Sequence, residues 1–131
     1  MLLPGENKKY KRVPLLNEQW HFPNDYELKK IYLIPLKDNI QNYDFIIVES
    51  LGWGEGDTAV LSTNFDDNFN SGHGAFLEEG YDAPFSGSYN ASIKVSVTKE
   101  NLTNILAMLL YKGANRPIDQ IGINQVYGIK L

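Results

Sequence analysis

Aromatic side chains interleaved with acids and amides are the residues of this sequence most suited to chemistry. They gather in the glycine-rich segment 51–57 and in the long polar segment 64–90. Sugars present C–H faces that pack on aromatic rings, and their hydroxyl groups hydrogen-bond to carboxylates and amides. Both segments therefore predict a binding surface for a glycan or another polar receptor. The candidate binding residues are Trp53, Glu55, Asp57, Asp66, Asp67, Asn70, Tyr81, Asp82 and Tyr89.

Paired carboxylates raise the alternative of a carbohydrate-active enzyme or its binding module. A glycosidase needs two carboxylates about 5 to 10 Å apart across a cleft. Adjacent residues of a strand point to opposite faces, so neither Asp66–Asp67 nor Glu78–Glu79 is itself such a pair. Asp67 and Glu79 could still converge, but acids in such segments are mostly solvated. We therefore expect binding without catalysis.

Metal and cofactor motifs are weak in this chain. Residues 66–70, Asp-Asp-Asn-Phe-Asn, are rich in oxygen ligands but lack the alternating spacing of an EF-hand. His21 and His73 lie far apart, and His73 sits between two glycines, which is typical of an exposed turn. Cysteine is absent. We predict no cofactor, with Ca²⁺ at residues 66–70 as the open option.

Length and charge limit the classes of function. The 131 residues are 43% hydrophobic and carry a net charge of -4. They suffice for one domain, which we place at residues 10–131 after a linker at 1–9. Nucleic-acid binding normally needs a basic face, and a membrane-spanning helix needs about 20 apolar residues. We expect neither nucleic acid nor membrane insertion.

Most of the chain has the periodicity of strands. Residues 92–98 alternate, with Ile93, Val95 and Val97 on one face, and Pro14 restricts a first strand at 10–16 to a sheet edge. Residues 31–36 and 45–48 are apolar on both faces, which predicts that the core buries one face and that another element, such as a second subunit, buries the other. Further strands are expected at 58–63 and 121–131, and turns at 19–25 and 114–120.

Residues 102–112 fit two interpretations. Leu102, Ile105, Leu106 and Leu109 follow a helical spacing, yet alternate residues of the same segment are also apolar. Periodicity does not separate a buried helix from a buried strand. We favour a strand, because the neighbouring segments are strands and sheets are rarely interrupted midway.

Two blocks of the sequence together resemble a known family. One block carries Ile31, Leu33, Leu36, Ile40, Asn42, Tyr43, Asp44, Phe45, Ile47 and Val48; the other carries Ile123, Val126, Tyr127, Gly128, Ile129 and Lys130. Their order and spacing resemble the C-terminal head domains of bacteriophage tail fibres and baseplate receptor-binding proteins, and of the fibres of phage-tail-like bacteriocins. The segment 50–90 matches nothing in that pattern.

The resemblance implies an antiparallel, jelly-roll-like β-sandwich that assembles as a homotrimer. It also implies a place in the virion, at the tip of a tail fibre, where the domain binds a bacterial surface glycan or surface protein without catalysis. A purely structural fibre cap or trimerisation domain is a second alternative. In that case substitutions in 64–90 would leave host adsorption unchanged.

Overall fold

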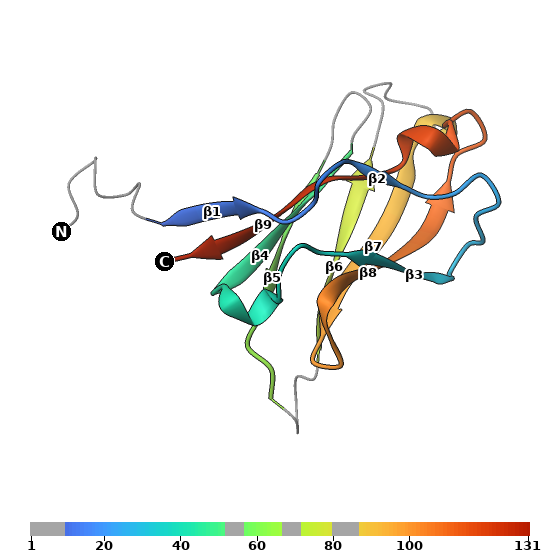
Figure 1. Cartoon of the computed structure of the whole chain (residues 1–131). Coiled ribbons are helices and arrows are strands. Elements are labelled where there is room, and N and C mark those ends of the chain that lie inside the picture. Colours follow the sequence, from blue (N-terminus) through green and yellow to red (C-terminus); the bar gives the residue numbers. More distant parts are fainter. Residues whose placement is uncertain (1–9, 52–56, 67–71, 80–86) are drawn as a thin grey trace.

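The protein is an all-β sandwich. The computed structural model describes residues 10–51, 57–66, 72–79 and 87–131. Their strands form two antiparallel sheets that pack face to face (Figure 1). The predicted fold class, an antiparallel β-sandwich, is confirmed.

The first sheet, sheet A, holds the strands from both ends of the domain. Strand β9 lies between β1 and β4, and the short β2 also pairs with β9. Lys11 is opposite Lys130, and Pro14 lies in the edge strand, as its chemistry predicts. In sheet order the strands are β1 (Lys11–Pro14), β9 (Gly122–Lys130), β4 (Phe45–Ser50) and β5 (Thr58–Ser62), with β2 (Trp20–His21) beside β9.

The second sheet, sheet B, is built around the long strand β8. The prediction of a strand at 102–112 is confirmed, because β8 pairs with a neighbour on each side. The helical spacing of the apolar residues in this segment arises because leucines lie on both faces of the strand. In sheet order the strands are β3 (Ile31–Pro35), β8 (Asn101–Lys112), β7 (Ala91–Thr98) and β6 (Gly72–Glu79).

The core lies between the sheets and is formed by alternate residues of the strands. The inward side chains of β7, predicted from the sequence, are fully buried. Phe22, from the segment after β2, is also fully buried and contacts Tyr32 edge to face, with ring centroids 5.4 Å apart. The inward strand residues include Ile46 and Val48 of β4, Ile93, Val95 and Val97 of β7, and Ile105, Ala107 and Leu109 of β8.

Tyr43 closes the sandwich where the chain passes from sheet B to sheet A. The preceding 3-10 helix η2 (Ile40–Asn42) is capped by Asn39, whose side chain accepts a hydrogen bond from the backbone of Gln41. The Tyr43 hydroxyl donates to Asp38 Oδ2 at 2.8 Å. Its ring covers Gly128, where a Cβ atom would lie 2.5 Å from Tyr43 Cγ. Residue 128 must therefore be glycine for this ring to pack.

Local expectations fare unevenly. Residues 64–90, for which the sequence leaves both a loop and short, irregular strands open, contain an eight-residue strand, β6. The turn expected at 19–25 is present at its end, where the Tyr26 N–H donates to the Pro23 carbonyl, but the segment also contains β2. His73 belongs to β6, where its ring stacks on Phe65 at 5.5 Å and its Nε2 lies 2.6 Å from the Asn64 carbonyl oxygen. It is half-buried, so the expectation of an exposed turn at His73 fails. Glycines on either side of a residue do not exclude a strand when the neighbouring strand supplies the packing.

Within the described ranges, no helix has the length and apolar character needed to cross a membrane.

Candidate binding surfaces

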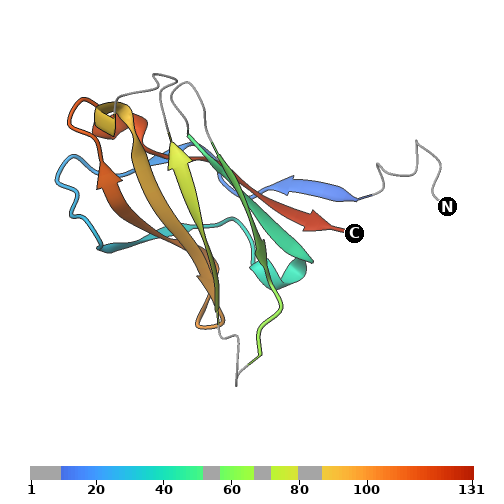
Figure 2. The ribbon, with the colours of Figure 1, turned by 180° about the vertical axis from the view of Figure 1, so that it is seen from behind.

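The two ends of the sandwich carry different connecting segments. Strands β4 and β6 end, and β5 and β7 begin, at the end that we call the distal end (Figures 1 and 2). The opposite, proximal end holds the end of β5, the start of β6 and the paired residues Lys11 and Lys130. Antiparallel strands reverse the chain at each turn, so segments separated by two strands emerge at the same end.

This arrangement divides the predicted binding residues between the two ends. Asp57 and Tyr89 lie at the distal end, whereas Asp66 is exposed at the proximal end. The structure therefore does not bring Asp66 together with the other two. The remaining candidates lie outside the described residues: Trp53, Glu55, Asp67, Asn70, Tyr81 and Asp82.

Asp57 ties sheet A to sheet B at the distal end. Its backbone exchanges two hydrogen bonds with Ser50: its N–H donates to Ser50 Oγ at 2.6 Å, and its carbonyl accepts from Ser50 N–H at 2.8 Å. Its carboxylate accepts from the backbone N–H of Thr58 at 2.9 Å and of Glu78 at 3.3 Å. Each carboxylate oxygen keeps further acceptor capacity. Asp57 is therefore a fixed acceptor at the start of β5, and it is half-buried.

A buried ion pair underlies the same end. Arg116 Nη2 lies 3.8 Å from Glu79 Oε2, and both side chains are fully buried. Glu79 ends β6 on the inward face, in phase with buried Leu77, so the expectation of a solvated acid is wrong here. The strand period would have placed Glu79 inside had β6 been recognised.

Arg116 also connects the segments that meet around this pair. Its Nη2 donates to the Gln120 carbonyl at 3.0 Å, and its Nη1 donates to the Tyr89 carbonyl at 3.4 Å. Burial lowers the pKa of Arg116, and the charge of Glu79 opposes that shift. The guanidinium stays charged, because its ordinary pKa lies far above neutral pH. It therefore fixes the backbone of Tyr89 relative to the β8–β9 connection.

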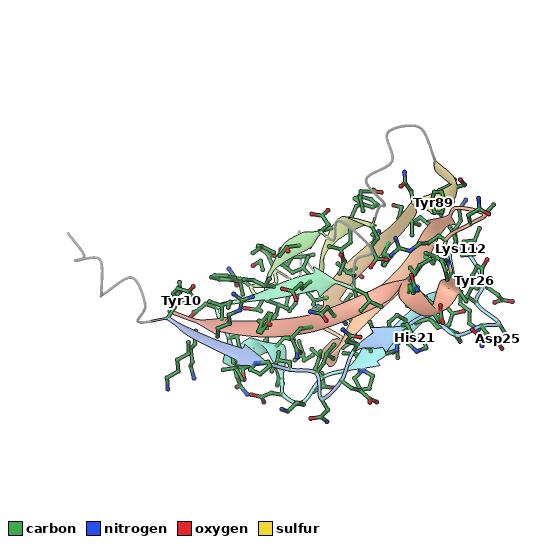
Figure 3. The ribbon with its side chains drawn as sticks, turned by 90° about the horizontal axis from the view of Figure 1, so that it is seen from above. Tyr10, His21, Asp25, Tyr26, Tyr89 and Lys112 are labelled. Atoms are coloured by element: carbon green, nitrogen blue, oxygen red, sulfur yellow. The ribbon has the colours of Figure 1, made fainter. Side chains whose placement is uncertain are left out.

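Backbone contacts complete this support. The N–H of Gly113 donates to the Asn90 carbonyl at 2.7 Å, and that of Asn115 donates to the Ser88 carbonyl at 2.8 Å. Lys112 Nζ donates to the Gly113 and Arg116 carbonyls at 3.0 and 2.9 Å. Figure 3 shows Tyr89 and Lys112 at one extremity of the molecule and Tyr10 near the other. The 3-10 helix η3 (Gly87–Tyr89) is thus held by a rigid neighbouring turn, which includes η4 (Ile118–Gln120).

Apolar side chains are exposed on the outer faces of both sheets. On sheet B, Ile31 and Leu33 of β3 are 53% and 51% exposed. On sheet A, Val60 is 61% exposed. A hollow of about 330 Å³ opens nearby on that face, lined by Tyr10, Phe45, Ile47, Ile129 and Leu131. The second apolar faces predicted for 31–36 and 45–48 are therefore present, and the residues that the structure describes cover them only in part.

The described residues hold no group of three or more His, Asp or Glu side chains that could bind a metal ion. The calcium option at residues 66–70 falls mostly outside the described residues, and Asp66 itself is exposed. Hydrogen bonds from Tyr43 and from the backbone of Asn39 lower the pKa of Asp38. This acid has a structural partner, Tyr43, rather than a second acid beside it.

Comparison with known proteins does not assign the chain to a family. No family model, no curated protein and no solved structure matches this chain. Its function therefore has to be argued from its own surfaces.

Proposed function

We propose that this chain is a non-catalytic receptor-binding head of a phage or phage-like tail fibre. In this proposal it acts as a homotrimer in the virion and binds a bacterial surface glycan or surface protein through its distal end. The observation that carries the proposal is the exposure of large apolar side chains on the outer faces of both sheets, which fits a domain that assembles.

Self-assembly is supported by the size and position of these side chains. Burying one large aliphatic side chain contributes about 1.5–3 kcal/mol, so the half-exposed Ile31, Leu33 and Val60 leave several kcal/mol available to a contact between copies. Scattered exposed hydrophobics are common on protein surfaces, but contiguous patches mark interaction sites. On β3, Ile31 and Leu33 are next neighbours on one face and lie opposite Met108 and Leu106 of β8.

Receptor binding at the distal end is supported by where the terminal strands lie. Lys11 and Lys130 are paired at the proximal end, with Phe45 opposite Ile129 beside them. A fibre attached through β1 or β9 would therefore present the distal end outward. That end carries Asp57 and Tyr89, together with the ends of the glycine-rich segment that contains Trp53.

The chemistry of the distal end favours recognition over proton transfer. The described acids there have structural partners: Asp57 accepts from two backbone N–H groups, and Glu79 faces Arg116. Asp57, which is half-buried and keeps acceptor capacity, suits a hydroxyl-bearing ligand, since an acceptor already held in place loses little entropy on binding.

Assembly can be tested by native mass spectrometry at micromolar concentration. We expect three times the chain mass of 14.8 kDa. A Leu33→Lys substitution should shift the population toward monomer, because the new charge would be buried in the contact, while Lys37→Gln on the following segment should not. A wild-type chain that is monomeric at high micromolar concentration would remove the assembly part of the proposal.

Recognition can be tested by adsorption of the purified domain to host cells and to a glycan array. We expect Trp53→Ala and Tyr81→Ala to weaken binding at least tenfold while circular dichroism stays unchanged. Asp66→Asn, at the proximal end, is the matched control and should bind as the wild type does. Unchanged adsorption in both aromatic variants would favour a purely structural cap.

A further inference from the structure

Gly74 is a glycine that the fold itself does not require. It lies near the middle of β6, facing outward, where glycine makes a strand less stable than alanine does. A Cβ atom at position 74 would meet Lys94 Cε and the Val95 carbonyl oxygen at 3.4 Å, which is ordinary contact. At Gly72, by contrast, a Cβ would lie 2.8 Å from the Val97 carbonyl oxygen. Packing therefore explains Gly72 and leaves Gly74 unexplained.

A glycine inside a strand often marks the close approach of a ligand. At Gly74 the missing side chain opens a hollow of about 340 Å³ on the outer face of sheet B, lined by Gly72, Gly74, Lys94, Ser96 and Thr98 among others. We call this hollow the β6–β7 trough. Its volume is in the size range of small-molecule sites.

The side chains in and beside the trough have complementary chemistry. Phe76 is not one of the lining residues, but it lies on the same face of β6 as Gly74, directly across from Lys94 in the strand pairing. It is 60% exposed, although large aromatic rings are usually covered. Ser96 and Thr98 face the same side of β7 as Lys94 and offer hydroxyl groups. Glu78, an acid on the same face of β6, accepts a hydrogen bond from Ser92 at 3.1 Å. The trough supplies hydroxyl groups and a cation, and Phe76 beside it supplies an apolar ring, in a chain whose net charge is -4.

We propose that the β6–β7 trough binds an acidic saccharide. The sugar ring packs on Phe76, its hydroxyl groups hydrogen-bond to Ser96, Thr98 and the backbone at Gly74, and its carboxylate or phosphate pairs with Lys94. This site lies on the face of sheet B, apart from the distal end. It rests on the proposed function only for the class of ligand, and it would stand if the distal end bound no glycan.

The test is a ¹⁵N–¹H NMR titration of the full chain with tetragalacturonate, with neutral cellotetraose and mannose 6-phosphate as further probes. We expect amide shifts at 72–76 and 94–98 with tetragalacturonate, and binding weakened at least fivefold between 20 and 300 mM salt. Strong shifts with mannose 6-phosphate would identify the anion as phosphate rather than carboxylate. Equal binding of cellotetraose would overturn the acidic assignment, and shifts confined to other residues would overturn the site.

Two variants and two controls isolate the trough. Gly74→Leu fills the hollow and should weaken binding at least tenfold. Gly74→Ala is its control, because it shows whether the strand tolerates a small side chain at this position. Lys94→Gln should weaken binding about fivefold and flatten its salt dependence, whereas Lys37→Gln should stay within twofold of the wild type. A Gly74→Leu variant that folds and binds normally refutes the proposal. A variant that changes the oligomeric state instead identifies the trough as a contact between copies, which also refutes it.

Discussion

Replacing Arg116 by methionine tests whether the buried ion pair holds the distal end together. Methionine fills much of the arginine volume but removes the cation that faces Glu79 and the donors to the Tyr89 and Gln120 carbonyls. Breaking a buried pair by removing one partner costs about 3–5 kcal/mol. Domains have about 5–15 kcal/mol of stability, so the variant should lose a large part of its free energy of unfolding.

The assay is equilibrium unfolding in urea followed by tryptophan fluorescence. With a urea dependence of about 2 kcal/mol per molar, the midpoint should fall by roughly 2 M. Glu79→Leu combined with Arg116→Met replaces both charges by apolar groups of similar volume, and should return to within about 1 kcal/mol of the wild type. The coupling energy from this double-mutant cycle should then be at least about 2 kcal/mol.

The double variant also separates stability from the shape of the distal end. It lacks the arginine donors to Tyr89 and Gln120, so the Asn115 amide, which donates to Ser88, should exchange its hydrogen faster than in the wild type. A loss below about 1 kcal/mol for Arg116→Met, or a double variant as unstable as the single one, would show that the ion pair does not hold the distal end together.

Three further predictions concern the core and its closure. Tyr43→Phe removes the main hydrogen bond that lowers the Asp38 pKa, so NMR titration should show that pKa rising toward 3.8. A carboxyl whose pKa is lower in the folded than in the unfolded state stabilises the fold at pH values above its unfolded pKa, and this stabilisation disappears as the pH falls. The variant should therefore lose less stability between pH 5 and 3 than the wild type. Gly128→Ala places a Cβ against the Tyr43 ring and should cost about 1–3 kcal/mol in urea unfolding, whereas a Tyr43→Leu background should reduce that cost. Phe22→Ala should cost about 3–5 kcal/mol by the same measurement, since Phe22 is fully buried; a loss below 1 kcal/mol would mean that this end of the core is loosely packed.

The sequence predicts strands well where one face is apolar. Alternation in 92–98 identified the inward residues Ile93, Val95 and Val97 before any pairing was known. Pairing partners are harder to predict. Strand β9 enters between β1 and β4, and the resulting contact of Gly128 with the Tyr43 ring joins residues 85 positions apart. Periodicity describes one strand, whereas this packing depends on the order of several.

The candidate site is harder to predict, because the sequence leaves both a loop and short strands open for residues 64–90. Without β6, these residues form a single surface on which Asp66 lies with Tyr89. With β6 in place, the chain reverses direction once more and the two residues lie at opposite ends. Glycines at 72 and 74 hide β6 in the sequence because they lower its strand propensity. The burial of Glu79 likewise follows only once β6 is assigned.

The pairing of β1 with β9 has a mechanical consequence. Lys11 lies opposite Lys130, and β1 runs from there toward the distal end. A force that pulls the start of β1 away from the distal end acts along the strand and strains its hydrogen bonds to β9 simultaneously. Pulling Lys11 and Lys130 apart sideways would instead open the same bonds one after another. The domain should therefore resist tension between its proximal and distal ends far better than tension between its own two termini, and forced-unfolding rates measured in the two directions would show the difference.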